Sequence, residues 1–177
     1  VDTVKKYAKA QLGKDLTDEE AEAIYQLKAR YFHELLPPSI FDGVRDLMQK
    51  IRNCGLKIGV VTGSGQRTLI ERVLSDFLTE DQVTTAFDVK RGKPNPDPYL
   101  TGLRKAGNYA PYEGIVVENA PLGIRSGVAA HCFTVAINSG PLSDSSLLDE
   151  GANILFPTIR KFADNWDDLI RKLKPGF

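Results

Sequence analysis

A hydroxyl residue followed by glycines ends an apolar run in the stretch VVTGSGQ, residues 60–66. Thr62 ends the run, and Gly63-Ser64-Gly65 precedes an amphipathic stretch. A hydroxyl and free backbone N–H groups at the start of a helix form a cradle for an anion. We therefore interpret Thr62, Gly63 and Ser64 as a candidate phosphate-binding group. Taken alone, the stretch favours the simpler alternative of a helix N-cap with turn glycines.

A second candidate is a lysine on a stiff loop, in KRGKPNPDPYL at residues 90–100. Two prolines restrict the backbone directly after Lys93. Asp97 and Pro98 are expected to be the N-cap and first residue of the next helix. A lysine held in this way can neutralise a phosphate as a point charge. A solvated loop lysine is the alternative reading of this segment.

The third candidate is a pair of oxygen ligands in GIVVENAPLG, residues 114–123. An apolar run that reads as a buried strand ends in Glu118 and Asn119. Carboxylate and carboxamide oxygens are the ligand type that a hard cation such as Mg²⁺ prefers. The alternative is a strand-end acid that merely reaches water.

The elements that must position these groups follow a regular alternation. Apolar strands are predicted at 57–61, 85–89, 114–118, 132–137 and 154–156, and amphipathic helices at 43–53, 66–77, 97–106, 121–130 and 159–173. This alternation predicts an α/β fold with a parallel sheet flanked by helices. Ligand sites of such sheets lie outside the carboxyl ends of the strands, so the three groups should meet at one edge. Together they are the parts needed to bind a phosphoryl group and its magnesium.

Residues 1–36 have a helical pattern of their own and end at a Pro-Pro break. A first helical segment runs to Gly13. Thr17 and Glu20 then match a capping box, in which each side chain satisfies the other residue's backbone amide at the start of a helix. The chain is therefore expected to contain a helical segment at 1–36 and an α/β region at 37–177.

Composition excludes several classes of partner. Lysines and arginines number 23 and aspartates and glutamates number 23, so net charge gives no reason to expect nucleic acid or an anionic membrane as a partner. No apolar stretch approaches the roughly 18 residues that a membrane span needs. Cys54 and Cys132 lie far apart in the sequence and suggest no disulfide framework, which fits a reducing cytoplasm. We expect a cytoplasmic, monomeric protein.

The segments TGSG, GKPNPDPY and VVENAPLGIRSGVAA resemble the second, third and fourth motifs of the haloacid dehalogenase (HAD) superfamily. The likeness is to its β-phosphoglucomutase-like branch of sugar phosphatases and phosphomutases and covers about residues 40–160, while 1–36 resembles the later part of that branch's helical cap. The resemblance implies a Rossmann-like core and Mg²⁺-dependent phosphoryl transfer on a small sugar phosphate through an aspartyl-phosphate. It leaves open whether the outcome is that of a phosphatase or a phosphomutase.

The resemblance also implies roles for single residues. Thr62 would donate its hydroxyl, and Gly63 its amide, to the transferring phosphoryl group. Lys93 would neutralise charge in the transition state. Glu118 and Asn119 would serve the magnesium. Most relatives carry a second acid where this chain has Asn119, so we expect weaker magnesium binding.

The family's first motif, Asp-x-Asp-Gly-(Thr/Val), supplies the nucleophile and is not found in this sequence. The nearest stretch, SIFDGV at 39–44, has Ile40 in the nucleophile's place, and we interpret Asp42 and Gly43 as the entry to a helix. The family's first strand would lie between the strands that end at Thr62 and Glu118. We therefore expect the chain to be the carboxyl-terminal part of a longer protein, with the nucleophile upstream. The alternative is a non-catalytic phosphate-binding or regulatory domain.

Overall fold

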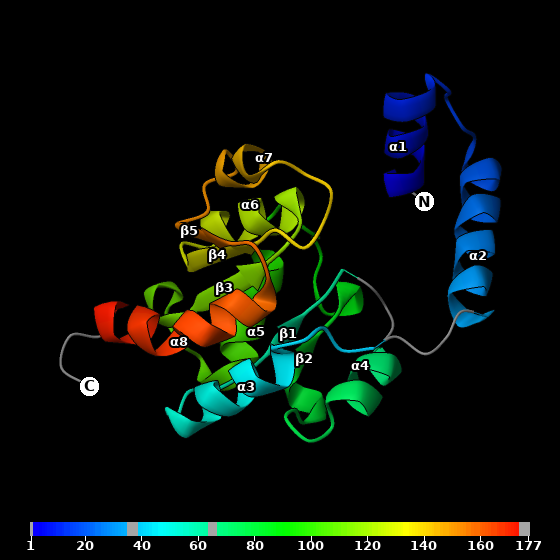
Figure 1. Cartoon of the computed structure of the whole chain (residues 1–177). Coiled ribbons are helices and arrows are strands. Elements are labelled where there is room, and N and C mark those ends of the chain that lie inside the picture. The colour runs from blue at the N-terminus through cyan, green and yellow to red at the C-terminus, as the bar shows by residue number, and fades with distance from the viewer. Residues whose placement is uncertain (1, 35–38, 64–66, 174–177) are drawn as a thin grey trace. The chain divides into compact units, whose positions relative to one another are not determined.

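The computed structural model describes residues 2–34, 39–63 and 67–173 of the 177-residue chain (Figure 1). The chain divides into two compact units, residues 1–39 and residues 40–177. The division falls close to the boundary predicted after residue 36. That the first unit is part of a cap stays a prediction.

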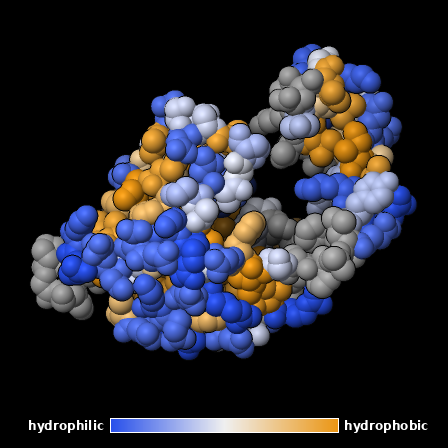
Figure 2. Space-filling view, viewed as in Figure 1, coloured by the Kyte–Doolittle hydropathy of each residue, from blue (hydrophilic) through white to orange (hydrophobic). Residues whose placement is uncertain are grey.

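The first unit is a pair of helices, α1 (Asp2–Leu12) and α2 (Asp18–Glu34). The predicted capping box is confirmed: the Thr17 amide donates to Glu20 Oε2 at 2.8 Å, and the Glu20 amide donates to Thr17 Oγ1 at 3.2 Å. Ala8 and Ala21 are buried, whereas apolar side chains on both helices stay exposed (Figure 2). Among the side chains of this unit that the structure describes, the buried ones are thus small.

The second unit confirms the predicted alternation of helices and strands. Its helices are α3 (Val44–Asn53), α4 (Arg67–Leu74), α5 (Asp97–Gly107), α6 (Pro121–Ala129), α7 (Asp144–Leu148) and α8 (Ile159–Leu173). Its strands are β1 (Val60–Val61), β2 (Val83–Thr84), β3 (Ile115–Glu118), β4 (Phe133–Ile137) and β5 (Ile154–Phe156). Three short 3₁₀ turns lie at Glu80–Gln82, Ala86–Asp88 and Pro111–Glu113. The fold is a Rossmann-like α/β architecture, as the sequence predicts.

The strands form two separate parallel sheets, β1–β2 and β3–β4–β5. In the larger sheet Val117 lies opposite Val135, and Glu118 lies opposite Ala136. Within the described ranges no strand pairs with the second edge of β1 or of β3. Each of these edges therefore carries backbone groups that a further strand could pair with.

Helices cover both faces of the larger sheet and connect it to the smaller one (Figure 1). On one face Phe162 and Trp166 of α8 pack with Val135 of β4, and their rings meet edge-on with centroids 5.8 Å apart. On the other face Ile124 of α6 packs against Ala136 of β4. Helix α5 contacts β1, β2 and α6. The outer surface of α3 and α8 is mostly hydrophilic, as a helix with one buried face requires (Figure 2).

Two strand predictions need correction. The strand predicted at 85–89 is wrong, because the strand is Val83–Thr84 and a 3₁₀ turn follows it. The Thr85 amide donates to Asp88 Oδ2 at 2.7 Å, and this local bond turns the chain out of the sheet. The strand predicted at 57–61 is reduced to Val60–Val61.

The entry of α3 is fixed by a close approach to α8. Gly43 is the N-cap of α3, with φ 90°, and a Cβ there would lie 2.6 Å from the Cα of Arg160. The interpretation of Asp42 and Gly43 as a helix entry is therefore confirmed. The Asp42 carboxylate is exposed and lies 3.8 Å from the Arg160 guanidinium.

Both cysteines, Cys54 and Cys132, are free. In the part of the chain that the structure describes, no helix is long and apolar enough to cross a membrane.

Candidate functional site

An ion pair between Lys93 and Glu118 forms the centre of the site. Lys93 comes from the loop before α5, and Glu118 is the last residue of β3. The two side chains are only 16% and 11% exposed, so water screens the pair poorly. The strand-end acid therefore does not simply reach water, and the lysine is not a solvated loop residue.

The first strand end reaches the same place. The ammonium of Lys93 also donates to the Val61 carbonyl at 3.2 Å, directly before Thr62. The Thr62 amide donates to the Thr84 carbonyl at 2.9 Å, and Gly63 is exposed. Thr62, Lys93 and Glu118 thus lie at one edge, whereas Ser64 lies outside the described residues. Their phosphate-binding roles stay predictions.

The Glu118 carboxylate accepts four hydrogen bonds. Its Oε1 accepts from the Lys93 ammonium and from the Tyr99 hydroxyl, the latter at 2.7 Å. Its Oε2 accepts from the backbone amides of Asn119 at 3.0 Å and Ala120 at 3.3 Å. An ionised carboxylate has about four lone-pair positions, so these donors satisfy them all. These four bonds fix the carboxylate in orientation.

Gly123 makes room for this carboxylate. A Cβ at position 123 would lie 2.1 Å from Cδ of Glu118. Gly123 lies in the first turn of α6, where the helix dipole also favours a negative charge. The glycine is therefore required by the position of the acid, a role that the sequence reasoning did not assign.

Tyr99 is a further member of the site that the sequence reasoning missed. It lies in the first turn of α5 and is 8% exposed. Burial and the nearby Glu118 carboxylate raise the pKa of Tyr99 far above its usual value, so the phenol stays protonated and donates. The Lys93 ammonium lies 4.9 Å from the centroid of its ring. The tyrosine of GKPNPDPY was the available signal.

Two contacts hold the loop that carries Lys93. Arg91 donates twice to Asp97, at 3.0 and 2.7 Å, and these bonds lower the pKa of Asp97. The buried Ser126 of α6 donates to the Asn95 carbonyl at 2.6 Å. The prediction that Asp97 caps α5 is wrong, because Pro96 is the N-cap and Asp97 begins the helix. Its carboxylate accepts both hydrogen bonds from the Arg91 guanidinium.

Asn119 is exposed, and the nitrogen of its carboxamide is held by a hydrogen bond. Its Nδ2 donates to Ser139 Oγ at 3.1 Å, which leaves the carboxamide oxygen as the atom suited to a cation. Ser139 follows β4 and was not predicted. Only the fold brings this residue beside the end of β3.

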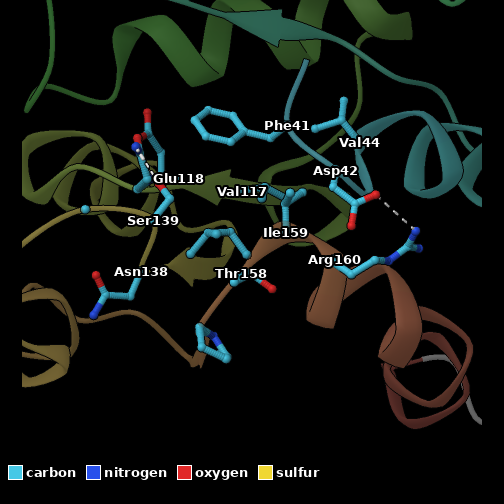
Figure 3. A pocket seen from close by; sticks show the side chains of 14 residues that line it. Phe41, Asp42, Val44, Val117, Glu118, Asn138, Ser139, Thr158, Ile159 and Arg160 are labelled. Carbon is cyan, nitrogen blue, oxygen red and sulfur yellow. Dashed lines mark hydrogen bonds and ion pairs between the residues drawn. The ribbon is translucent and has the colours of Figure 1, made fainter. Parts of the chain in front are cut away.

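A pocket of about 900 Å³ borders Glu118 and Asn119. Figure 3 shows Glu118 and Ser139 on one side of it and the Asp42–Arg160 ion pair on the other, with Val117 and Ile159 between them. Val117 belongs to a strand, yet its side chain is 39% exposed. The pocket thus joins an apolar sheet face to a polar edge.

The site fits magnesium in the kind of donor but offers few ligands. Asn119 presents an oxygen, and Glu118 places a negative charge beside it. No group of three or more His, Cys, Asp or Glu side chains suited to a metal occurs among the described residues. Because Glu118 already accepts four bonds, it can bind a cation directly only if one donor is released.

Comparisons with known proteins identify relatives of the chain. Hexitol phosphatase A of Escherichia coli is 38% identical over 98 residues, which are 55% of this chain and 45% of that protein. Beta-phosphoglucomutase of Bacillus subtilis is 25% identical over 159 residues, 85% of this chain and 68% of that protein. The chain therefore spans less than half of the first of these curated relatives.

A solved structure is similar over nearly the whole chain. A Bacteroides vulgatus protein provisionally described as a beta-phosphoglucomutase is 43% identical, with a TM-score of 0.87, over 98% of this chain and 71% of that one. The model of the haloacid dehalogenase-like hydrolase family matches residues 2–137. The chain belongs to this family, in its β-phosphoglucomutase-like branch.

Proposed function

We propose that these 177 residues are part of an enzyme that transfers a phosphoryl group of a small sugar phosphate with the help of Mg²⁺. The observation that carries the proposal is the Lys93–Glu118 pair beside Thr62 at the carboxyl edge of β1 and β3. The names of the relatives, hexitol phosphatase and beta-phosphoglucomutase, support the substrate class.

Each residue has a chemical task in this proposal. Lys93 neutralises charge that spreads over the phosphoryl oxygens in the transition state. Thr62 and Gly63 donate hydrogen bonds to the same oxygens. Glu118 holds the ammonium of the lysine in place. Mg²⁺, bound beside Asn119, would neutralise further phosphate charge.

The nucleophile is proposed to be an aspartate outside these 177 residues. The open edges of β1 and β3 suit a parallel strand, whose carboxyl end would place an aspartate beside Thr62 and Lys93. Attack of its carboxylate on phosphorus would form an aspartyl-phosphate and break the bond between phosphorus and the sugar oxygen, which leaves with a proton as a sugar hydroxyl. Transfer to water makes the protein a phosphatase, and transfer to a sugar hydroxyl makes it a mutase.

The two free cysteines fit the proposed cytoplasmic location. We also expect the protein to be a monomer.

A second candidate function is phosphate binding without catalysis. It is supported by Asn119 in place of an acid and by the small number of acids that the described residues gather at the site. In that case the Lys93–Glu118 edge would bind a phosphate ester and never cleave it.

The test compares the 177-residue chain with an extended protein, which adds whatever coding sequence precedes Val1 in the genome. We expect the extended protein to turn over hexitol or hexose phosphates in the presence of Mg²⁺, and the 177 residues alone to be inactive. Phosphate binding by an extended protein that turns over none of these esters would favour the non-catalytic alternative. Turnover by the 177 residues alone would show that the nucleophile lies within them.

Exchange of the carboxamide should change the magnesium dependence of the extended protein. Asn119→Asp adds a charged oxygen, which Mg²⁺ prefers, so the half-saturating magnesium concentration should fall. Glu118→Gln removes the neighbouring charge and should raise it. Magnesium titrations of turnover for the three proteins measure this order. If neither substitution moves the midpoint, these residues do not form the magnesium site.

A further inference from the structure

Tyr99 contacts both members of the central ion pair with different parts of its side chain. Its hydroxyl donates to Glu118 Oε1 at 2.7 Å. Its ring centroid lies 4.9 Å from the Lys93 ammonium, within the range of a cation–π contact. Resting on the proposed function, we propose that Tyr99 is a positioning residue that fixes Glu118 and Lys93 as one unit, with the ammonium aimed at the phosphoryl group.

The hydrogen-bond inventory of Lys93 supports this role. An ammonium has three donors. Among the described residues, Glu118 Oε1 and the Val61 carbonyl each accept from the Lys93 ammonium. The third N–H of the ammonium can donate to a phosphate oxygen. The direction of this donor depends on where the Glu118 carboxylate holds the ammonium.

Tyr99 controls that position because it shares Oε1 with the lysine. The backbone amides of Asn119 and Ala120 bind only Oε2 of Glu118. Rotation of the carboxylate about its Cγ–Cδ bond is therefore limited by the donors to Oε1. Without the hydroxyl, the flexible lysine would be the remaining donor at Oε1. The Lys93 ammonium and the Glu118 carboxylate could then shift together. The third N–H of the ammonium would no longer point in a fixed direction.

Tyr99→Phe isolates this role in the extended protein. Phenylalanine keeps the ring and leaves Glu118 with three of its four donors, so the carboxylate stays paired with Lys93 and the fold should persist. We expect kcat/KM to fall about tenfold, as is common when a residue that orients a functional group is lost. The affinity for inorganic phosphate, measured by ³¹P NMR titration, should fall as well.

A double-mutant cycle distinguishes positioning from a general structural effect. In a Glu118→Ala background the hydroxyl has lost its acceptor, so Tyr99→Phe should change both quantities less than twofold. Phosphate affinity remains measurable even where turnover is slow. An equal loss in both backgrounds would overturn the proposal, because Tyr99 would then not act through Glu118.

The matched control is Thr134→Val. Thr134 is fully buried in β4 and donates to the Cys132 carbonyl at 3.1 Å, so the variant also loses a buried hydroxyl. The ¹⁵Nζ resonance of Lys93, identified by its loss in Lys93→Ala, should move in Tyr99→Phe and stay in Thr134→Val. If Lys93→Ala lowers kcat/KM but Tyr99→Phe behaves like this control, the inference on Tyr99 fails alone. If Lys93→Ala has no effect, the proposed function fails.

Discussion

Lys93→Ala should lower kcat of the extended protein by about a hundredfold or more, as loss of other preorganised charge stabilisers does. The ammonium is the cation that the structure places at this edge in contact with both Glu118 and the carbonyl before Thr62. Its removal also leaves a carboxylate that is only 11% exposed without its counter-ion. Steady-state kinetics with a sugar phosphate at saturating magnesium measures the effect.

The matched control for Lys93→Ala is Lys90→Ala. Lys90 belongs to the same loop but is exposed. Its removal should leave kcat within twofold. A loss of similar size in both variants would mean that the loop, and not the ammonium of Lys93, is what the substitution disturbs. An unchanged kcat in Lys93→Ala would return this lysine to a purely structural role.

Gly123→Ala should reduce turnover far more than it reduces stability. The added Cβ would lie 2.1 Å from Cδ of Glu118, so the carboxylate must leave the amides of Asn119 and Ala120. A displacement of about 1 Å at such a group can cost about a hundredfold in rate. Overpacking costs about 1–3 kcal/mol, and the better helix propensity of alanine offsets about 1 kcal/mol of it.

Gly59→Ala serves as the control for this prediction. A Cβ at position 59 would meet the Gln82 carbonyl at 3.5 Å, an ordinary contact, and Gly59 precedes β1 away from Glu118. Denaturant unfolding and kinetics of both variants separate the two effects. Normal turnover in Gly123→Ala would show that the observed position of the carboxylate is not needed for the reaction.

The sequence alone was sufficient for the alternation of elements and for the expectation that Thr62, Lys93 and Glu118 meet at one edge. Periodic apolar positions are local signals, so a helix near residues 159–173 and a strand around residues 154–156 could be predicted, close to the observed Ile159–Leu173 and Ile154–Phe156. The positions of Thr62 and Glu118 at strand ends were likewise visible, because parallel strands bring their carboxyl ends to one edge, and Lys93 was visible on the loop before a helix. The capping box at Thr17 is a local pattern of the same kind.

Side-chain hydrogen bonds that form over a few residues are the reason why two predictions from the sequence were wrong. The segment 85–89 is apolar enough for a strand, but Thr85 and Asp88 bond each other and end the strand at Thr84. Asp97 has the right type for a cap, but Arg91 takes its carboxylate. In both cases a particular side-chain partner outweighed a general preference.

Only the tertiary structure decided how the acid is held. Tyr99 lies 19 residues before Glu118, and Ser139 lies 20 residues after Asn119. The GKPNPDPY motif draws attention to Tyr99, but no local pattern shows that Tyr99 or Gly123 contacts the carboxylate or that Ser139 contacts Asn119. They meet because α5, α6 and the end of β4 converge on one sheet edge. Residue types and strand order determined which groups reach this edge. Packing across the sheet determined which of their oxygens remain available for chemistry.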